Sequence, residues 1–412
     1  MRTIVAALAV LAAAVPAAMA GWSTIASDVG TAATGIYFTD ATTGFLPADE
    51  NGAGAEIVKS TDGGKTWTTN EPHQGGLLFL DVAGYGENIV VAGALGEEYS
   101  IDGGAYFNTS SGGGSGQCVR AVGARGNPDA IAVVGEFGLF NPKNGVAMST
   151  DGGAIFTTFD AKLFTDARYG AFPSAKTWYI SAGNWPEAND DKPSNDDFAP
   201  KNDDFSDAPS TITRTPRFEL RKTAKGGYKP YVRLPGRDAM VTGNETIFQA
   251  QISLSTDAGK TWNSVFENKG DFYANGIACI DDNNCCFVGE ADAGAAAGAR
   301  IHCTNDAGAN WNRTLFLPGP QNSLLDITAT GTAGEYWAVG GTLSSLDANA
   351  TFYHSTNSGN SWTLDSTISG SYASAVDCRL PPPVIRESTA PSCCAIDGFD
   401  MALKCENWRA SG

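Results

Sequence analysis

Residues 60–67 read STDGGKTW, and this octapeptide decides the fold of the chain. Its pattern, Ser/Thr-x-Asp/Asn-x-Gly-x-x-Trp/Phe, recurs five more times. The later copies begin at Ser100, Ser149, Ser255, Thr304 and Ser355. Measured at the third position, successive copies are 40, 49, 106, 49 and 51 residues apart. A period of this length indicates a repeat architecture, which has to be identified before the rest of the fold is interpreted.

The octapeptide has the composition of a tight hairpin between two strands. Asp or Asn at the third position can accept hydrogen bonds from backbone N–H groups two or three residues on, and Gly at the fifth can adopt a positive φ. The last aromatic residue begins the next strand and can pack on a neighbouring repeat. We therefore predict structural roles rather than ligand binding for the residues at the third and eighth positions. These are Asp62, Trp67, Asp102, Asp151, Asp257, Trp262, Asp306, Trp311, Asn357 and Trp362.

The octapeptide resembles the Asp-box, also called the bacterial neuraminidase (BNR) repeat. Asp-boxes occur in the β-propellers of sialidases, sortilin-type receptors, xyloglucan-degrading hydrolases and photosystem II assembly factors. Six copies cover nearly the whole chain. The resemblance implies a propeller, but it does not distinguish an enzyme from a binding protein.

The first residues predict export. Residues 1–20 combine a basic start, an apolar run and a small-x-small cleavage site at Ala18-Met19-Ala20, which is typical of a signal peptide. No later stretch is long and apolar enough to span a membrane, so we expect a secreted mature chain. A formal net charge of −18 argues against a nucleic-acid partner.

Aligned on the octapeptides, residues 21–412 predict one all-β domain. We expect a seven-bladed β-propeller of four-stranded antiparallel blades with Asp-box hairpins. Six blades contain an octapeptide, and the seventh is formed by the C-terminal stretch, where Glu406-Asn407-Trp408 stands in place of the hairpin's end. Residues 21–25 resemble the segment that follows each octapeptide, so we expect them to supply the outer strand of blade seven and to close the ring.

The double spacing before Ser255 predicts an insertion over residues 184–245 within blade four. Two blades, one without its octapeptide, are the alternative. The first half, 184–210, holds eight acids against Lys192 and Lys201, a net −6. Calcium could bind there, although no EF-hand spacing is present and a solvated segment is favoured.

The second half of the insertion, 211–237, holds eight Arg and Lys against Glu219, a net +7. It is either a binding patch for a protein or glycan, or a charged loop that balances the acidic half. The candidate binding residues are Arg214, Arg217, Arg221, Tyr228, Tyr231, Arg233 and Arg237.

Eight of the nine cysteines form two matching sets. They are Cys279, Cys285, Cys286 and Cys303, and Cys378, Cys393, Cys394 and Cys405. In each set the first cysteine should face one member of the doublet, and the other member should face the cysteine on the third strand; which member takes which partner stays open. Four disulfides fit an oxidising compartment. The ninth cysteine, Cys118, is expected to be a buried thiol or an intermolecular link. The sequence contains no Cys-x-x-Cys pair and no histidine motif that would predict a metal site.

Four sequons mark glycosylation sites that a eukaryotic secretory route would use. They are Asn108, Asn244, Asn312 and Asn349. We also expect His73, His302 and His354 to have ordinary structural or surface roles.

A sialidase-type hydrolase would need arginines from several blades and suitably spaced carboxylates. No arginine lies between Arg2 and Arg120. Five aspartates follow inner strands and could converge, but no pair stands out. They are Asp81, Asp129, Asp281, Asp282 and Asp326.

The pattern Ile-x-Phe-x-Asp-Ala-x-x-Gly-Phe at 36–45, followed by the first octapeptide, is most similar to the photosystem II stability and assembly factor family. This resemblance implies a cofactor-free propeller that holds a membrane-protein intermediate, partly through an arginine patch. The secretory signal, the cysteines and the sequons depart from that family. We therefore expect a secreted, non-catalytic module that binds a protein or glycan, with no cofactor. The alternatives are an exo-α-sialidase-type glycoside hydrolase, and a sortilin-like receptor ectodomain or cell-wall glycoprotein.

Overall fold

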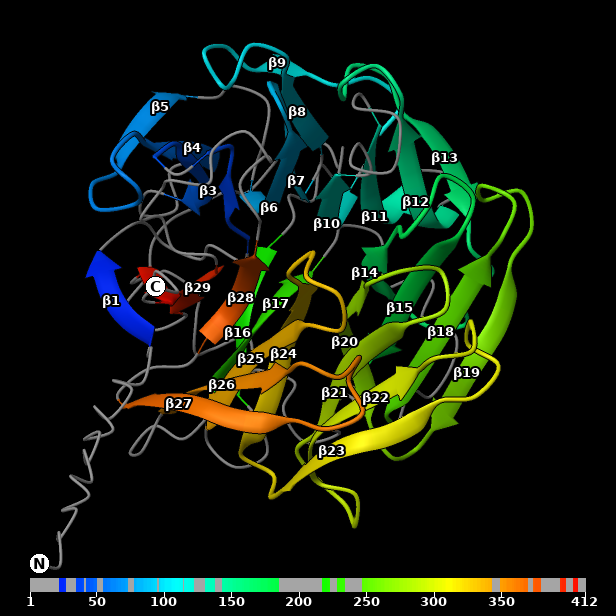
Figure 1. Ribbon diagram of the computed structural model, residues 1–412. Helices are drawn as coiled ribbons and strands as arrows, with labels where there is room; N and C mark the ends of the chain where they lie inside the picture. The colour runs from blue at the N-terminus through cyan, green and yellow to red at the C-terminus, as the bar shows by residue number, and fades with distance from the viewer. Residues whose placement is uncertain are drawn as a thin grey trace, which may run out of the picture.

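The computed structural model describes sixteen stretches of the chain. They are residues 22–26, 35–40, 42–49, 55–72, 78–94, 96–113, 115–121, 130–137, 143–184, 217–222, 228–233, 247–342, 349–369, 373–378, 393–397 and 403–406. Every regular element within these stretches is a β-strand, and the sheets are arranged around a ring (Figure 1). Among these residues no helix has the length and apolar character needed to cross a membrane.

Six four-stranded sheets are antiparallel blades with an octapeptide between the third and fourth strands. Blade one contains β2 (Tyr37–Phe38), β3 (Gly44–Asp49), β4 (Ala55–Ser60) and β5 (Thr68–Pro72). Blade two contains β6 (Leu78–Tyr85), β7 (Asn88–Ala94), β8 (Gly96–Ser100) and β9 (Asn108–Thr109). Blade three contains β10 (Ser115–Ala121), β11 (Ile131–Phe137), β12 (Lys143–Ser149) and β13 (Thr157–Asp160).

The other three blades repeat this plan. Blade four contains β14 (Ala167–Ala171), β15 (Trp178–Asn184), β18 (Gln249–Ser255) and β19 (Asn263–Lys269). Blade five contains β20 (Tyr273–Cys279), β21 (Cys285–Ala291), β22 (Gly298–Thr304) and β23 (Asn312–Pro318). Blade six contains β24 (Asn322–Ala329), β25 (Tyr336–Thr342), β26 (Asn349–Ser355) and β27 (Thr363–Ser369).

One further four-stranded sheet differs from these six. It has the order β1-β30-β29-β28 and consists of β1 (Trp22–Ala26), β28 (Ala373–Cys378), β29 (Cys393–Asp397) and β30 (Leu403–Glu406). The prediction of a seven-bladed propeller is therefore wrong, since the structure has six blades, each with an octapeptide hairpin. A hairpin needs a direct connection between the third and fourth strands. In this sheet the strand beside β30 comes from the other end of the chain, so no such hairpin can form.

The double spacing arises inside blade four. There β15 pairs directly with β18, and Asn184 lies opposite Gln249 although the chain between them is long. That chain includes a separate two-stranded sheet, β16 (Arg217–Lys222) with β17 (Tyr228–Arg233). The long segment therefore emerges between the second and third strands of one blade, as an insertion does.

The hydrophobic core is a series of layers between neighbouring sheets. One layer joins blades one and two and contains Phe45, Ile57 and Val91, and another joins blades four and five around Tyr273 and Phe287. Because both faces of a blade are covered, all seven residues of β20 are buried. Burying one large apolar side chain contributes about 1.5–3 kcal/mol, so these layers hold the blades together.

The six octapeptides share one set of hydrogen bonds. In blade one, Ser60 Oγ donates to Asp62 Oδ1 (2.9 Å) and accepts from Gly64 N (2.8 Å), while Thr66 N donates to Asp62 Oδ1 (2.9 Å). The aspartate thus accepts from backbone three and four residues on, one residue further than predicted. Hydrogen bonds from the Thr66 side chain and backbone lower the pKa of Asp62 to about 2. The carboxylates of these hairpins therefore belong to the turns.

Glycine at the fifth position of the octapeptide is needed for its φ and for packing. Gly104 has φ +77, and a Cβ there would lie 2.4 Å from the Phe45 ring of blade one. Gly359 has φ +76, and a Cβ there would lie 2.3 Å from Cys286 Sγ of blade five. In both cases the hairpin packs directly on the preceding blade.

Three disulfides are present among the described residues, as the cysteine pattern predicted. They are Cys279–Cys285, Cys286–Cys303 and Cys378–Cys393. In each doublet the first member, Cys285 or Cys393, is bonded to the cysteine of the preceding strand, which resolves the choice that the sequence left open. Cys394 lies opposite Cys405 in the β29–β30 register, and Cys118 lies in β10 opposite Val134.

Candidate functional site

Two of the candidate hydrolase carboxylates, Asp81 and Asp326, are buried in the innermost strands. Each lies at a bulge, and its Oδ1 accepts a hydrogen bond of 2.9 Å from the next backbone N–H, Val82 or Ile327. Asp326 Oδ2 also accepts from Val376 N in β28 (3.1 Å), so it connects blade six to the sheet that contains β1. Asp81 therefore accepts a bond within its own strand, and Asp326 accepts one within its strand and one from another sheet.

Asp281 and Asp282 lie in the β20–β21 turn. Asp281 Oδ1 accepts from the backbone N–H groups of Asn283 and Asn284, both at 2.8 Å. Asp282 Oδ2 accepts from Thr177 Oγ1 of blade four at 2.9 Å. These two aspartates therefore hold the turn and bind it to its neighbour, and Asp129 lies outside the described residues.

A buried polar cluster that the sequence reasoning missed lies between blades four and five. Tyr273 donates a hydrogen bond to Glu290, and the Arg168 guanidinium lies 5.7 Å from the centre of the Tyr273 ring. Burial, followed by the charge of Glu290, raises the pKa of the Tyr273 phenol well above its usual range. The sequence signal that could have revealed this cluster is the presence of Arg168 and Glu290 in otherwise apolar strands. Both Tyr273 and Glu290 are nearly inaccessible to solvent, which favours a packing role.

His302 is stacked among aromatic rings on β22. Its ring is 5.1 Å from Phe287 and 5.4 Å from Phe272, measured between centroids. Burial, together with Arg300 and Arg313, lowers the pKa of His302 to about 3. The imidazole is therefore neutral at physiological pH and has a core position.

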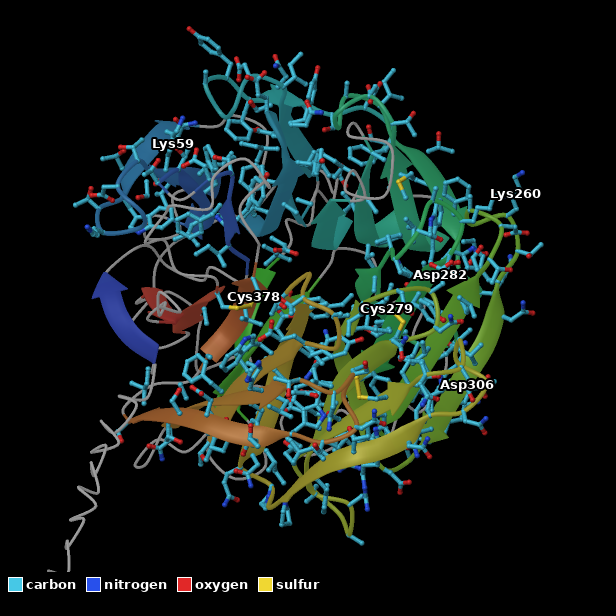
Figure 2. All side chains as sticks on the ribbon, in the orientation of Figure 1. Lys59, Lys260, Cys279, Asp282, Asp306 and Cys378 are labelled. Carbon is cyan, nitrogen blue, oxygen red and sulfur yellow. A yellow bond between two sulfur atoms is a disulfide. The ribbon has the colours of Figure 1, made fainter. Side chains whose placement is uncertain are left out.

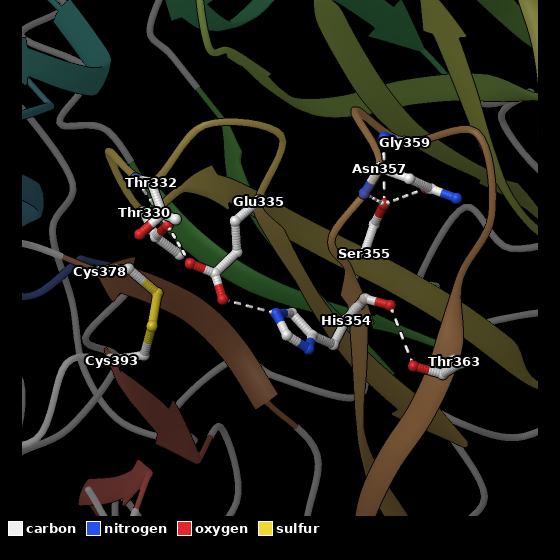
Figure 3. A network of polar contacts seen from close by, with 10 residues as sticks. All are labelled: Thr330, Thr332, Glu335, His354, Ser355, Asn357, Gly359, Thr363, Cys378 and Cys393. Atoms are coloured by element: carbon white, nitrogen blue, oxygen red, sulfur yellow. Dashed lines mark hydrogen bonds and ion pairs between the residues drawn. A yellow bond between two sulfur atoms is a disulfide. The ribbon is translucent and has the colours of Figure 1, made fainter. Parts of the chain in front are cut away.

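His354 and Glu335 form a polar network at the edge of blade six (Figure 3). His354 Nε2 is 2.8 Å from Glu335 Oε1, and Thr330 Oγ1 donates to Glu335 Oε2 at 2.6 Å. The His354 ring stacks on Trp337 with centroids 4.2 Å apart. The hydrogen bond with His354, followed by those with Thr330 and Thr332, lowers the pKa of Glu335 to about 2. This network connects the β24–β25 turn to β26, and its histidine is already hydrogen-bonded to a carboxylate.

The basic half of the insertion folds partly into the β16–β17 hairpin. Its register places Arg217 opposite Arg233 and Arg221 opposite Lys229. The same hairpin contains the other two described candidates, Tyr228 and Tyr231. Arg214, Arg237 and the acidic half lie outside the described residues, so calcium binding there stays a prediction.

Three predicted sequons lie in described strands. Asn108 and Asn312 begin the outer strands β9 and β23 and are exposed, while Asn349 begins β26 and is partly exposed. Asn244 and His73 lie outside the described residues. Within the described part of the chain, no three His, Cys, Asp or Glu residues gather as a metal site would require.

Comparison with solved structures finds the same propeller fold in proteins of very different sequence. YCF48 bound to a D1 peptide is 14% identical with a TM-score of 0.53, and the match covers 94% of this chain and 97% of that one. An ancestral GH74 enzyme is 13% identical with a TM-score of 0.54, and 94% of this chain matches 48% of it. The hydrazine synthase of Kuenenia stuttgartiensis is 11% identical with a TM-score of 0.53, covering 92% of this chain and 97% of that one.

These likenesses show the fold alone. No protein-family model matches the sequence. No curated protein matches it either.

Proposed function

We propose that this protein is an exported β-propeller of the Asp-box class that binds an anionic protein or glycan without changing it chemically. The hairpin β16–β17 is the proposed binding element. Residues 1–20 would direct the chain to the secretory route, and the sequons at Asn108 and Asn312 would then be accessible to glycosylation.

The observation that carries this proposal is the register of the hairpin. The register pairs Arg217 with Arg233 and Arg221 with Lys229, so two basic residues are paired with two basic residues, and Glu219 is the one acidic residue of the sheet. Like charges directly opposite each other destabilise a strand pair. An anionic partner would offset that repulsion, and arginine is well suited to paired contacts with carboxylate, sulfate or phosphate groups.

The carboxylates support binding over hydrolysis. Asp81 accepts a hydrogen bond at a bulge of its own strand, while Asp326 and Asp282 accept hydrogen bonds from neighbouring sheets. A glycoside hydrolase needs two carboxyl groups that face the substrate. The GH74 likeness, at 13% identity, extends to the fold only.

The test uses the full-length, disulfide-intact protein on an array of sialylated, sulfated and neutral glycans, and in a panel of glycosidase assays. The variant combines Arg217→Ser, Arg221→Ser and Arg233→Ser. The control is Lys260→Ser, because Lys260 is an exposed cation at the rim of blade four (Figure 2). We expect binding without turnover, lost in the triple variant and kept in the control.

Two results would contradict the proposal. Turnover of a sialoside or glucan would favour the hydrolase alternative. Equal binding by the wild-type and triple-variant proteins would exclude the hairpin as the binding element. A further variant that replaces residues 186–245 with a short Gly-Ser linker tests the whole insertion, and the Asn184–Gln249 pairing allows such a short connection.

A further inference from the structure

Exposed apolar side chains gather on two neighbouring blades. Six large hydrophobic side chains are exposed in the described part of the chain, and four of them lie in blades two and three. They are Tyr85 (41%), Ile101 (57%), Tyr106 (67%) and Ile155 (62%), and we call them the hairpin patch. Single exposed hydrophobic residues are ordinary, but a group of them marks an interaction surface.

Backbone contacts place these four residues on one continuous surface. Gly103 N donates to Glu87 O (2.9 Å), which ties the turn after Tyr85 to the hairpin of blade two. A Cβ at Gly152 would lie 3.1 Å from Ile101 Cγ2, so Ile101 reaches the hairpin of blade three. Ser111 N donates to Ala154 O at 2.9 Å, next to Ile155. The patch therefore crosses the junction between the two blades.

Two residues of the patch stand where three other blades have a side chain that stabilises the hairpin by a hydrogen bond. In three blades the seventh residue of the octapeptide donates a side-chain hydrogen bond to the aspartate at the third position. These bonds join Thr66 to Asp62 (2.7 Å), Thr261 to Asp257 (2.7 Å) and Asn310 to Asp306 (2.8 Å). Blades two and three have Tyr106 and Ile155 at this position instead. The exchange of a turn-stabilising donor for an exposed apolar side chain indicates a role outside the fold.

The surroundings of the patch are acidic. Three exposed carboxylates lie beside the patch in sequence: Glu87 in the turn after Tyr85, Asp102 next to Ile101, and Asp151 in the octapeptide of Ile155. Residues 66–119 contain no Lys or Arg. The sixth octapeptide residue is Ala105 or Ala154 here, where blades one and four have lysine. Asp102 is ionised at neutral pH, because hydrogen bonds from Ser100 and the backbone lower its pKa. Lys59 of blade one donates a hydrogen bond from its Nζ to Gly103 O (3.4 Å).

From this combination we infer that the hairpin patch docks a protein segment that carries both apolar and basic side chains. Exposed isoleucines fit apolar side chains of a polypeptide better than the hydroxyl-rich surface of a sugar, and the exposed carboxylates of Glu87, Asp102 and Asp151 complement Lys or Arg. This inference extends the proposed binding function to a second surface, distinct from the β16–β17 hairpin and opposite to it in charge.

The test uses variants that should fold at least as well as the parent. Tyr106→Thr with Ile155→Thr removes the apolar groups and installs the donor found at Thr66 and Thr261. Leu364→Thr, which removes an exposed side chain of blade six, is the matched control. The probes are fluorescein-labelled peptides of alternating Lys and Leu, Lys and Ser, or Glu and Leu, measured by fluorescence anisotropy against the full-length protein.

We expect the Lys-Leu peptide to bind best, with affinity at least about tenfold weaker in the double variant and unchanged in L364T. Added salt should weaken the binding. Equal affinity in the double variant, preference for the Glu-Leu peptide, or no binding by the wild-type protein would overturn the inference. So would patch-dependent dimerisation in sedimentation or patch-dependent vesicle binding, because each would identify a different occupant. The double variant leaves the arginines of β16–β17 intact, so its result is separate from the glycan test.

Discussion

His354 Nε2 lies 2.8 Å from Glu335 Oε1, and this pair connects the β24–β25 turn to β26 (Figure 3). Both side chains are 23% exposed, so the contact is only partly screened by water. The two residues are 19 positions apart in the chain. Their contact depends on the pairing of β25 with β26 and reports on the integrity of blade six.

Acid should weaken blade six through Glu335. Its pKa is lowered from 4.5 to about 2 in the folded protein, chiefly by the hydrogen bond with His354. A lowered carboxyl pKa stabilises the fold above the unfolded value, and this stabilisation is lost as pH falls from about 4.5 to about 2. Urea unfolding at several pH values should show this loss in the wild-type protein and a smaller one in Glu335→Gln. An equal pH dependence in both proteins would contradict the prediction.

Removing the first-position hydroxyl of an octapeptide should destabilise the blade. Ser255 Oγ is buried, accepts from Gly259 N at 2.8 Å and donates to Asp257 Oδ1 at 2.9 Å. Ser255→Ala leaves a buried N–H without its acceptor, and we expect a loss of about 1–3 kcal/mol in unfolding free energy. Ser255→Thr is the control, because Thr304 makes the same bonds in blade five. A loss of equal size in both variants would point to crowding rather than to the hydrogen bonds.

Substitutions at two neighbouring positions with positive φ, Ser358 and Gly359, should have opposite effects on stability. Ser358 has φ +57, and relieving this conformation with Ser358→Gly should gain up to about 1 kcal/mol. Gly359→Ala should destabilise, because its Cβ would meet the sulfur atoms of Cys286 and Cys303. Denaturant midpoints measure both effects. Stabilisation by Gly359→Ala would show that the hairpin does not pack on blade five as described.

Blade five should depend on its second disulfide. Cys286 and Cys303 are 17 residues apart, and a cross-link of this span stabilises by about 3 kcal/mol in the chain-entropy description. Cys286→Ala with Cys303→Ala should lower the unfolding free energy by a similar amount. Peptide mapping under non-reducing conditions checks the pairing, and a link between Cys279 and Cys286 would contradict it. The same map should reveal a fourth link, Cys394–Cys405, which the β29–β30 register places opposite each other.

Much of the fold follows from local sequence signals. The octapeptide fixes a turn through neighbouring residues such as Ser60, Asp62 and Gly64, so its strands and hairpins could be predicted. That the two cysteines of each doublet have different partners could also be predicted, because neighbouring residues on a strand point to opposite faces. The total number of blades was predicted wrongly as seven, because the C-terminal strands were counted as a further blade although their sheet takes β1 from the other end of the chain and lacks the octapeptide hairpin.

The candidate sites were harder to predict, because their roles depend on contacts between distant segments. In the sequence, Asp326 was a candidate hydrolase carboxylate. In the structure it accepts a hydrogen bond from Val376 N, which lies 50 residues away in another sheet. Tyr106 and Ile155 were visible as exceptions in the aligned octapeptides. Their meaning depended on knowing that the seventh-position side chain donates to the aspartate in three other blades and that Tyr106 and Ile155 are exposed.

The pairing of β1 with β30 also determines how the molecule would respond to mechanical force. Trp22 lies opposite Glu406 and Ala26 opposite Leu403, so residues 22 and 406 lie at the same end of the strand pair. Opposed pulling at residues 22 and 406 would therefore load the hydrogen bonds one after another, from the Trp22 end inward. Such a pair unzips at low force, whereas strands loaded in shear would have to break all their bonds together. Tension applied at residues 22 and 406 would therefore open the β1–β30 pair by unzipping.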